Sequence, residues 1–322
     1  MNGLLCGVFG TSKDQKSLFV NSVAKKSEVE GIIVYHKSES GVRYSFLDDS
    51  QFPDKIQGYS RIASICDYAY YIFPSSGKLT APDGELAVLL DGFGTEGTIE
   101  LIDANIAKET IYSSFKGLKL SKFPIEERES KSSIIDLARI QPSRNFPKSG
   151  TVIYIDRAFN VKGVGLVVLG FILSGEVSLH DKLRLIPSQG SKKYAEVKGI
   201  QVSDEDYDSA GRGIRVGLSL KGVELNDLSK SSWLDDDSCL LSNKISMKFS
   251  QSPFYKQALV ERDLHAQLPG EIVLGKISKG AQQNQLLVSL QLEVPVWEGM
   301  KVCIIDLNAK NLRLAGVGSA VV

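Results

Sequence analysis

The sequence is poor in the residues that build metal and redox sites. It has four cysteines and three histidines among 322 residues, and no two cysteines stand at C-x-x-C spacing. This pattern argues against a zinc ribbon or a dithiol redox centre. We therefore assign no metal site to the histidines and predict reduced, buried thiols at Cys6, Cys66, Cys239 and Cys303.

The chain also lacks an excess of one charge and a long apolar run. Lys plus Arg equals Asp plus Glu, 38 against 38, so no overall field attracts nucleic acid or an anionic membrane, and any polyanion must meet a local patch. No stretch reaches the roughly 18 to 20 apolar residues that cross a bilayer, and the apolar N-terminus has no basic region or cleavage site before or after it. We expect a cytoplasmic protein without DNA or membrane partners.

What is present is an ordinary folding composition whose pattern changes near residue 149. Before that point, expected strands and helices alternate, which favours an α/β sheet. We predict buried strands at 4–10, 67–73 and 97–103, a hairpin of 31–37 with 41–49, a helix at 16–26 with a basic last turn, and a helix at 84–93 that ends at a glycine. The first domain is placed at residues 1–148, with a Pro-rich linker over 142–150.

After residue 149 the pattern consists of short β-rich runs about ten residues apart, which is typical of barrels or sandwiches. An acidic turn at Asp235–Asp237 separates two such sets. We therefore expect two β domains, at 149–243 and 244–322. The aromatic run at Tyr68, Tyr70, Tyr71 and Phe73 is interpreted as core packing in a central strand, in preference to a platform for stacking bases.

Residues 10–17, GTSKDQKS, fall between a strand and a helix, as a phosphate-binding loop G-x-x-x-x-G-K-[ST] would. Gln15 replaces the second glycine, and a side chain there crowds the backbone that must curl around phosphates. We predict a vestigial nucleotide-binding site formed by Gly10, Lys13, Lys16, Ser17 and Asp48. Ser17 is also the predicted magnesium ligand. The alternative is a helix N-terminus that only retains the shape of such a loop.

The other nucleotide-handling parts are further from a working pattern. The expected Asp-x-x-Gly is replaced by residues 48–52, DDSQF, and the guanine-reading Asn-Lys-x-Asp by Ile102-Asp103-Ala104-Asn105. GTP or GDP with Mg²⁺ is therefore expected to bind weakly or not at all. We assign no catalytic residue.

Residues 154–234 resemble the second domain of the translational GTPases, the elongation factor Tu β-barrel. The likeness is carried by Asp156-Arg157, Gly163-Val164-Gly165, the strand GIQV and Ala210-Gly211 with Arg215-Val216-Gly217. Within that family the chain most resembles archaeal selenocysteine-specific elongation factors and their methanogen relatives, including the candidate pyrrolysine factor. The resemblance implies a degenerate P-loop-type G domain followed by two β-barrels, in a monomer.

The resemblance also implies where an aminoacyl-tRNA would be held. The terminal adenosine would pack beside Gln201, and Asp156, Arg157, Ser203 and Arg215 would frame the esterified amino acid. Arg157 and Arg215 resemble the basic residues that hold a selenolate in selenocysteine factors, and two guanidiniums suit an anionic or strongly accepting group. Ser203 departs from the expected His or Arg. Without the resemblance, these charged residues would be interpreted as salt-bridge partners.

Three functions follow, in order of preference. The first is an elongation factor-like protein that binds aminoacyl-tRNA, with the ribosome as a further partner and with weakened or lost GTP hydrolysis. Phe52 stands where the family has a water-orienting His, and phenyl cannot replace imidazole in that task. The second is a regulatory paralogue that binds proteins and has lost tRNA. The third is an active GTPase with unusual motifs, whose hydrolysis Lys16→Ala would abolish.

Overall fold

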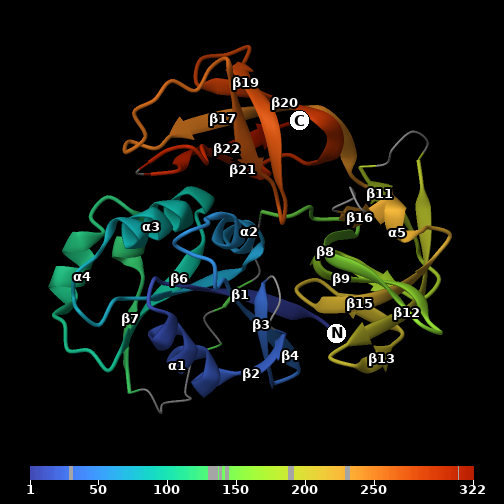
Figure 1. The fold of residues 1–322 in the computed structure, drawn as a ribbon, viewed down its shortest axis with the longest axis horizontal. Coiled ribbons are helices and arrows are strands. Elements are labelled where there is room, and N and C mark those ends of the chain that lie inside the picture. Colours follow the sequence, from blue (N-terminus) through green and yellow to red (C-terminus); the bar gives the residue numbers. More distant parts are fainter. Residues whose placement is uncertain are drawn as a thin grey trace.

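The structure is a computed structural model that describes residues 1–28, 32–129, 137, 140–141, 145–187, 192–228, 233–310 and 312–322. An α/β domain is followed by two β domains, and the three are arranged around a common junction (Figure 1). Gly31 of the expected hairpin and residues 142–144 of the expected linker lie outside the described residues.

The first domain is built on a seven-stranded sheet of order β2-β3-β4-β1-β5-β6-β7. From β4 to β7 neighbouring strands are parallel, whereas β2, β3 and β4 form an antiparallel meander. The strands are β1 Gly3–Phe9, β2 Lys25–Glu28, β3 Ile33–Glu39, β4 Val42–Asp48, β5 Tyr68–Ile72, β6 Glu96–Ile102 and β7 Ile125–Arg128. β1 is buried along its whole length, as an apolar strand between two helical layers must be.

The helices cover both faces of this sheet, as the alternating pattern predicts. The buried side of α1 packs with Cys6 and Val8 on one face, whereas α2 and α3 pack with Leu5 and Phe9 on the other. The helices are α1 Lys13–Val23, α2 Gln57–Ile65, α3 Ala81–Phe93, α4 Lys108–Ser114 and the 3-10 turn η1 Lys119–Lys122. α3 begins with a capping box of Thr80 and Asp83 and ends at Gly94 in the left-handed conformation.

The second domain is a seven-stranded sheet of order β11-β16-β8-β9-β15-β12-β13 that closes on itself because β11 also pairs with β12. Its strands are β8 Val152–Val161, β9 Gly165–Ser174, β11 Lys182–Ile186, β12 Tyr194–Val202, β13 Glu205–Tyr207, β15 Arg215–Lys221 and β16 Trp233–Asp235. A two-stranded sheet of β10 Glu176–Ser178 and β14 Ser209–Gly211 and the short helix α5 Leu225–Leu228 complete it. Its core is made of alternating inward-facing aliphatic residues.

The third domain is a closed six-stranded barrel of order β17-β20-β19-β18-β21-β22. Its strands are β17 Leu240–Gln251, β18 Arg262–Gln267, β19 Ile272–Lys279, β20 Gln285–Val296, β21 Lys301–Ile305 and β22 Leu314–Val321. Figure 1 places this barrel above α2 and α3 of the first domain. Because this barrel is closed, each of its strands pairs with a neighbour on both sides. The expectation of an α/β domain followed by two β-barrels is correct.

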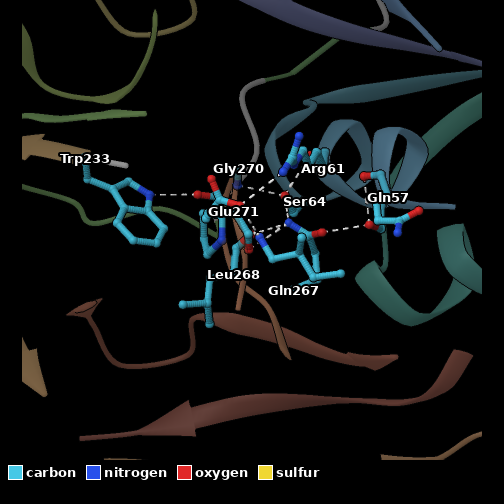
Figure 2. Close-up of polar contacts among 11 residues, drawn as sticks. Gln57, Arg61, Ser64, Trp233, Gln267, Leu268, Gly270 and Glu271 are labelled. Carbon is cyan, nitrogen blue, oxygen red and sulfur yellow. Dashed lines mark hydrogen bonds and ion pairs between the residues drawn. The ribbon is translucent and has the colours of Figure 1, made fainter. Parts of the chain in front are cut away.

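Buried polar contacts join the three domains at their junction (Figure 2). Gln267 is fully buried and donates to the carbonyls of Leu268 and Glu271, while its Oε1 accepts from the Ser60 hydroxyl of α2 at 2.7 Å. The Ser64 hydroxyl accepts from Gly270 N at 2.9 Å, and Arg61 pairs with Glu271 at 3.1 Å.

The second domain joins the same turn. Trp233 donates from Nε1 to the Pro269 carbonyl at 2.8 Å, and one continuous hydrophobic cluster contains residues of all three domains. α2 is therefore tied to the third barrel by directed hydrogen bonds as well as by apolar packing.

Several local expectations need correction. Lys25 and Lys26 are not the basic last turn of a helix, since α1 ends at Val23 and both lysines belong to the edge strand β2. Asp235, expected in an acidic turn, belongs to the strand β16. It is fully buried at the end of β16 and accepts a bidentate pair of hydrogen bonds from Arg184. Pairing with Arg184 is what allows a carboxylate to be buried there.

The expected thiols and the aromatic strand are as predicted. All four cysteines are buried and free, and Tyr68, Tyr70 and Tyr71 are buried in the interior strand β5. The sequence pattern did not predict the helix α2, which makes the contacts to the third domain.

Candidate functional site

Lys16, the lysine of the phosphate loop, is buried with only 2% of its surface exposed. Its ammonium contacts Asp48 Oδ1 at 2.6 Å, the Asp49 carbonyl at 3.0 Å and the Tyr59 hydroxyl at 2.5 Å. The hydroxyl of Tyr59 also donates to Asp48 Oδ1 at 2.9 Å. An ammonium has three protons, and each has a partner within the chain.

The Tyr59 ring occupies the centre of this cluster. It is fully buried, packs on Phe9 and Phe52 at ring-centroid distances of 5.1 and 5.2 Å, and lies beneath the Lys16 ammonium. Burial, and secondarily the Asp48 charge, raise the pKa of Tyr59 well above its usual value. The phenol therefore stays protonated and acts as a hydrogen-bond donor to the carboxylate.

The other residues of the phosphate loop are also either bonded within the chain or exposed to solvent. The amide of Gln15 is buried and bridges the end of β6 and the loop after β5, donating to the Ile102 carbonyl at 3.4 Å and accepting from Ser75 N at 3.2 Å. Ser12 caps α1 by accepting from Gln15 N. Ser17 and Lys13 are exposed, and the Gly10 carbonyl oxygen lies 3.3 Å from the Tyr59 hydroxyl.

These residues do not fit a magnesium-bound triphosphate in this arrangement. Lys16 has no free proton for a phosphate, and the Gln15 side chain fills the place that glycine leaves open in such a loop. Ser17, the expected metal ligand, is exposed, whereas Asp48 is buried and bonded to Lys16. Phe52 is 3% exposed and packs in the core, and Asp103 and Asn105 are exposed beyond the end of β6. The roles in nucleotide binding that the sequence assigned to Gly10, Lys13, Lys16, Ser17 and Asp48 stay predictions.

The residues expected at an aminoacyl end lie together on the second barrel. Across the sheet Arg157 lies opposite Leu169, Leu169 opposite Gly217, and Gly217 opposite Gln201. Paired residues point to one face of a sheet, so the row carries Arg157 and Gln201 on the same face. Gly217 leaves open space between them because it has no side chain.

Arg215 and Asp156 form a buried ion pair beside this row. Their side chains are 4% and 10% exposed, the Nη2 to Oδ2 distance is 2.9 Å, and the guanidinium lies 5.1 Å from the centre of the Phe171 ring. Asp156 falls at a bulge in β8, which turns its side chain out of the regular ladder. Burial raises the pKa of Asp156, and the neighbouring Arg215 opposes the shift.

A cavity of about 150 Å³ opens at this row. Gln201, Ser203 and Arg215 line it, together with Leu169, Asp204, Val216 and Gly217. Its remaining wall includes His36, from the β3–β4 hairpin of the first domain. Three of the five expected residues thus share one cavity at the junction of two domains, and Asp156 touches it through Arg215.

His36 is the cavity residue that the sequence did not point to. Its Nδ1 lies 3.1 Å from the Ser45 hydroxyl. Burial lowers the pKa of His36 to about 4, and the Arg43 and Arg215 guanidiniums add to that shift. The ring is therefore neutral at pH 7 and offers one donor and one acceptor.

Arg43 and Ser203 connect the two sides of the junction. The Nη2 atom of Arg43, on β4, donates to the Ser203 hydroxyl in the β12–β13 turn. Ser203 and Asp204 have φ values of 52° and 66°, the pattern of a tight two-residue hairpin. Gly3 and Gly213 bring the barrel against β1 nearby, where a Cβ on Gly3 would lie 2.6 Å from the Gly213 carbonyl.

Comparison with known proteins agrees with this architecture. The family model for elongation factor Tu domain 2 matches residues 165–234. An uncharacterized protein of Methanocaldococcus jannaschii is 27% identical over 99% of both chains. The selenocysteine-specific elongation factor of the same organism is 31% identical over 52% of this chain and 40% of its own length.

Residues 165–234 belong to the elongation factor Tu domain 2 family, and the comparisons support a member of the translational GTPase family.

The fold agrees over almost the whole chain with a solved member. Elongation factor SelB from Methanococcus maripaludis, in complex with the GTP analogue GPPNHP, superposes with a TM-score of 0.81 at 20% identity, covering 99% of this chain and 79% of that one. In this chain Lys16 of the phosphate loop has polar partners at the end of β4, just after it and on α2. No sequence signal identifies Tyr59 as one of them, since it lies eleven residues beyond Asp48 on a helix that the pattern does not disclose.

No helix in the described part of the chain has the length and apolar character to span a bilayer.

Proposed function

We propose that this translational GTPase homologue carries an aminoacyl-tRNA without a GTP-driven switch. The observation that supports this most directly is the convergence of Gln201, Ser203 and Arg215 on one cavity, with Asp156 and Arg157 beside it. The cargo is a specialised aminoacyl-tRNA of the selenocysteine or pyrrolysine type. The protein works in the cytoplasm, as a monomer, and delivers to the ribosome.

The chemistry of the cavity selects the end of the RNA. Gln201 lies exposed on β12 with its amide bonded to Asp206 at 2.9 Å, where it can pack against a terminal adenosine. Arg215 and Arg157 favour an anionic or strongly accepting amino-acid side chain, and the neutral His36 adds a donor that needs no counter-charge. Asp156 holds the Arg215 guanidinium on the Phe171 ring.

The proposal that no GTP-driven switch operates is based on the contacts of Lys16 and of α2. Nucleotide binding would have to break three contacts of the Lys16 ammonium and displace the Gln15 amide. α2, which touches this cluster through Tyr59, is also bonded to the third domain through Ser60 and Ser64. We infer that the domain arrangement is held by these contacts and needs no triphosphate.

The test is a gel shift of purified protein with total tRNA, charged and uncharged, with and without GTP, at about 100 mM salt. We expect charged tRNA to be preferred and GTP to make no difference. Gln201→Ala and Arg157→Gln should each weaken binding, and sequencing the bound RNA names the cargo. Arg215→Lys is preferable to Arg215→Ala, because alanine would leave the buried Asp156 carboxylate unpaired.

Titration with labelled GTP and GDP checks the second half of the proposal. Saturable binding at micromolar nucleotide, with hydrolysis abolished by Lys16→Ala, would establish instead an active GTPase with unusual motifs. If no tRNA is retained under any condition, the regulatory paralogue that binds proteins becomes the better description, and Asp156 with Arg215 is then a structural pair.

A further inference from the structure

A second and larger cavity adjoins the one at the domain junction. It has a volume of about 620 Å³ and lies at the β2 edge of the seven-stranded sheet, beside the last turn of α1. His36 and Ser203 line both cavities. A ligand group in the smaller cavity therefore has the larger one as its neighbour, and the combined space is within the range of small-molecule sites.

Among the described residues, those that line the larger cavity carry positive charge only. Lys25, Lys26, Lys37 and Arg43 contribute four positive charges, and no carboxylate is among the described residues that line it. Lys37 also contacts Glu39 at 2.9 Å, in a solvent-accessible pair of the kind that holds its partners weakly. The whole chain, by contrast, has equal numbers of acidic and basic residues. Such a local excess in a concave surface concentrates anions far more than scattered surface lysines would.

The strand register explains how these residues come together. Lys25 lies opposite His36 on the β2–β3 ladder, and Ser38 lies opposite Arg43 on the β3–β4 ladder. These four residues share one face of the sheet. Lys26 and Lys37 belong to the other face, so the cavity extends around the edge strand.

Arg43 is the group best placed to recognise a ligand here. Its Nη2 is directed to Ser203, and its Nε is buried and has no hydrogen-bond partner among the described residues. A guanidinium with donors in reserve matches the paired oxygens of a phosphate. Positive potential at this place is also consistent with the neutral state of His36, which faces Lys25, Arg43 and Arg215.

We propose that this basic cavity binds a backbone phosphate of the RNA strand whose 3′ end lies in the smaller cavity. The proposal rests on the proposed function, and it adds a contact made by the first domain. Lys25, Lys26 and Lys37 neutralise the phosphate, and Arg43 orients it relative to Ser203. The RNA end is thereby held from both domains, without any contribution from the phosphate loop.

The test compares two variants with the same change of charge. In the first, Lys25, Lys26 and Lys37 are all replaced by Gln. In the control, Lys108, Lys116 and Lys122 are replaced by Gln; these exposed residues lie beside β6 and β7, near the opposite edge of the sheet. Circular dichroism and thermal melting check that both remain folded. Arg43 is left in place because it contacts Ser203.

Binding of charged tRNA is measured by gel shift from about 50 to 200 mM salt. For the first variant we expect affinity to fall about tenfold or more at 100 mM salt. The slope of log K against log salt should become shallower by about 0.7 to 0.9 for each phosphate that the variant no longer neutralises. The control should stay within about twofold of the wild type.

The outcomes separate this site from the proposed function. If the wild type binds charged tRNA and the first variant matches it in affinity and slope, the phosphate site is refuted and the carrier function stands. If both variants weaken equally, the effect is one of overall charge, and the site is refuted as well. If the wild type binds no RNA at all, the carrier function fails, and the assignment of RNA to this cavity fails with it.

Discussion

The Lys16 ammonium lies 2.6 Å from the Asp48 carboxylate, and both groups are buried. In a phosphate loop the lysine would pair with a phosphate and the aspartate would assist a metal ion. Here each serves as the counter-ion of the other, and the Tyr59 hydroxyl bonds to both. Lys16 and Asp48 are thus part of the buried interior of the first domain.

Lys16→Met should therefore impair folding. It leaves the Asp48 carboxylate buried without its counter-charge, which costs about 3 to 5 kcal/mol. The free energy of unfolding, measured in urea, should fall by that amount. The double variant Lys16→Met with Asp48→Asn should be less destabilised than the sum of the two single variants, since the pair is removed together. A decrease below about 1 kcal/mol for Lys16→Met would show that the pair is not a structural element.

Gln267→Ala should loosen the docking of the third barrel on α2. The substitution removes the hydrogen bonds of Gln267 with the Ser60 hydroxyl and with two carbonyls, each worth about 0.5 to 1.5 kcal/mol net. The Ser60 hydroxyl keeps the Gln57 carbonyl, and the two carbonyls keep backbone N–H partners, so no group is left unsatisfied. Hydrogen exchange should accelerate in α2 and in the turn at 268–271. The matched control is Gln291→Ala on the exposed part of β20, which should leave exchange unchanged. Equal exchange in both variants would contradict the role of this contact.

Because His36 is buried and neutral, we expect the protein to lose stability on mild acidification. Its pKa in the folded protein, about 4, is below the usual value of about 6.5. The neutral ring thus contributes stability that is complete above about pH 6.5 and is lost as the pH falls towards 4, by at most about 3 kcal/mol. Unfolding of the wild type should show this slope, and His36→Gln should reduce it. Titration of the ring near pH 6.5 in an NMR experiment would contradict the prediction.

For Asp49 we expect a contribution to stability with the opposite dependence on pH. Burial raises the pKa of this carboxyl, with partial compensation by the hydrogen bond from Gln51 N and by Lys16. Its protonated form is favoured in the fold, so its contribution is present below the unfolded pKa and is lost as the pH rises through the folded value. Asp49→Asn, which keeps the acceptor for Gln51, should melt at a higher temperature than the wild type at pH 7. The difference should shrink at about pH 4, and a lower melting temperature at pH 7 would refute this reasoning.

The sequence by itself determined the layers and the family. Alternating strand and helix patterns before residue 149 and repeated β runs after it favour an α/β domain followed by two β domains, because each pattern can bury its apolar side in only a small set of layer arrangements. The residues around Arg157, Gln201 and Arg215 could be named from the sequence because the resemblance to the second domain of elongation factor Tu implies their positions. Their register then follows from the ladder.

Only the tertiary structure decided what those residues meet. Tyr59, His36 and Arg43 are far in sequence from Lys16, Arg215 and Ser203, and contacts between distant segments leave no periodic signal. The same is true of Gln267 and α2, whose pairing depends on how two domains dock. Whether Lys16 is free for a phosphate or paired with Asp48 is decided by the filling of buried space and the need to compensate each buried charge, neither of which the local sequence encodes.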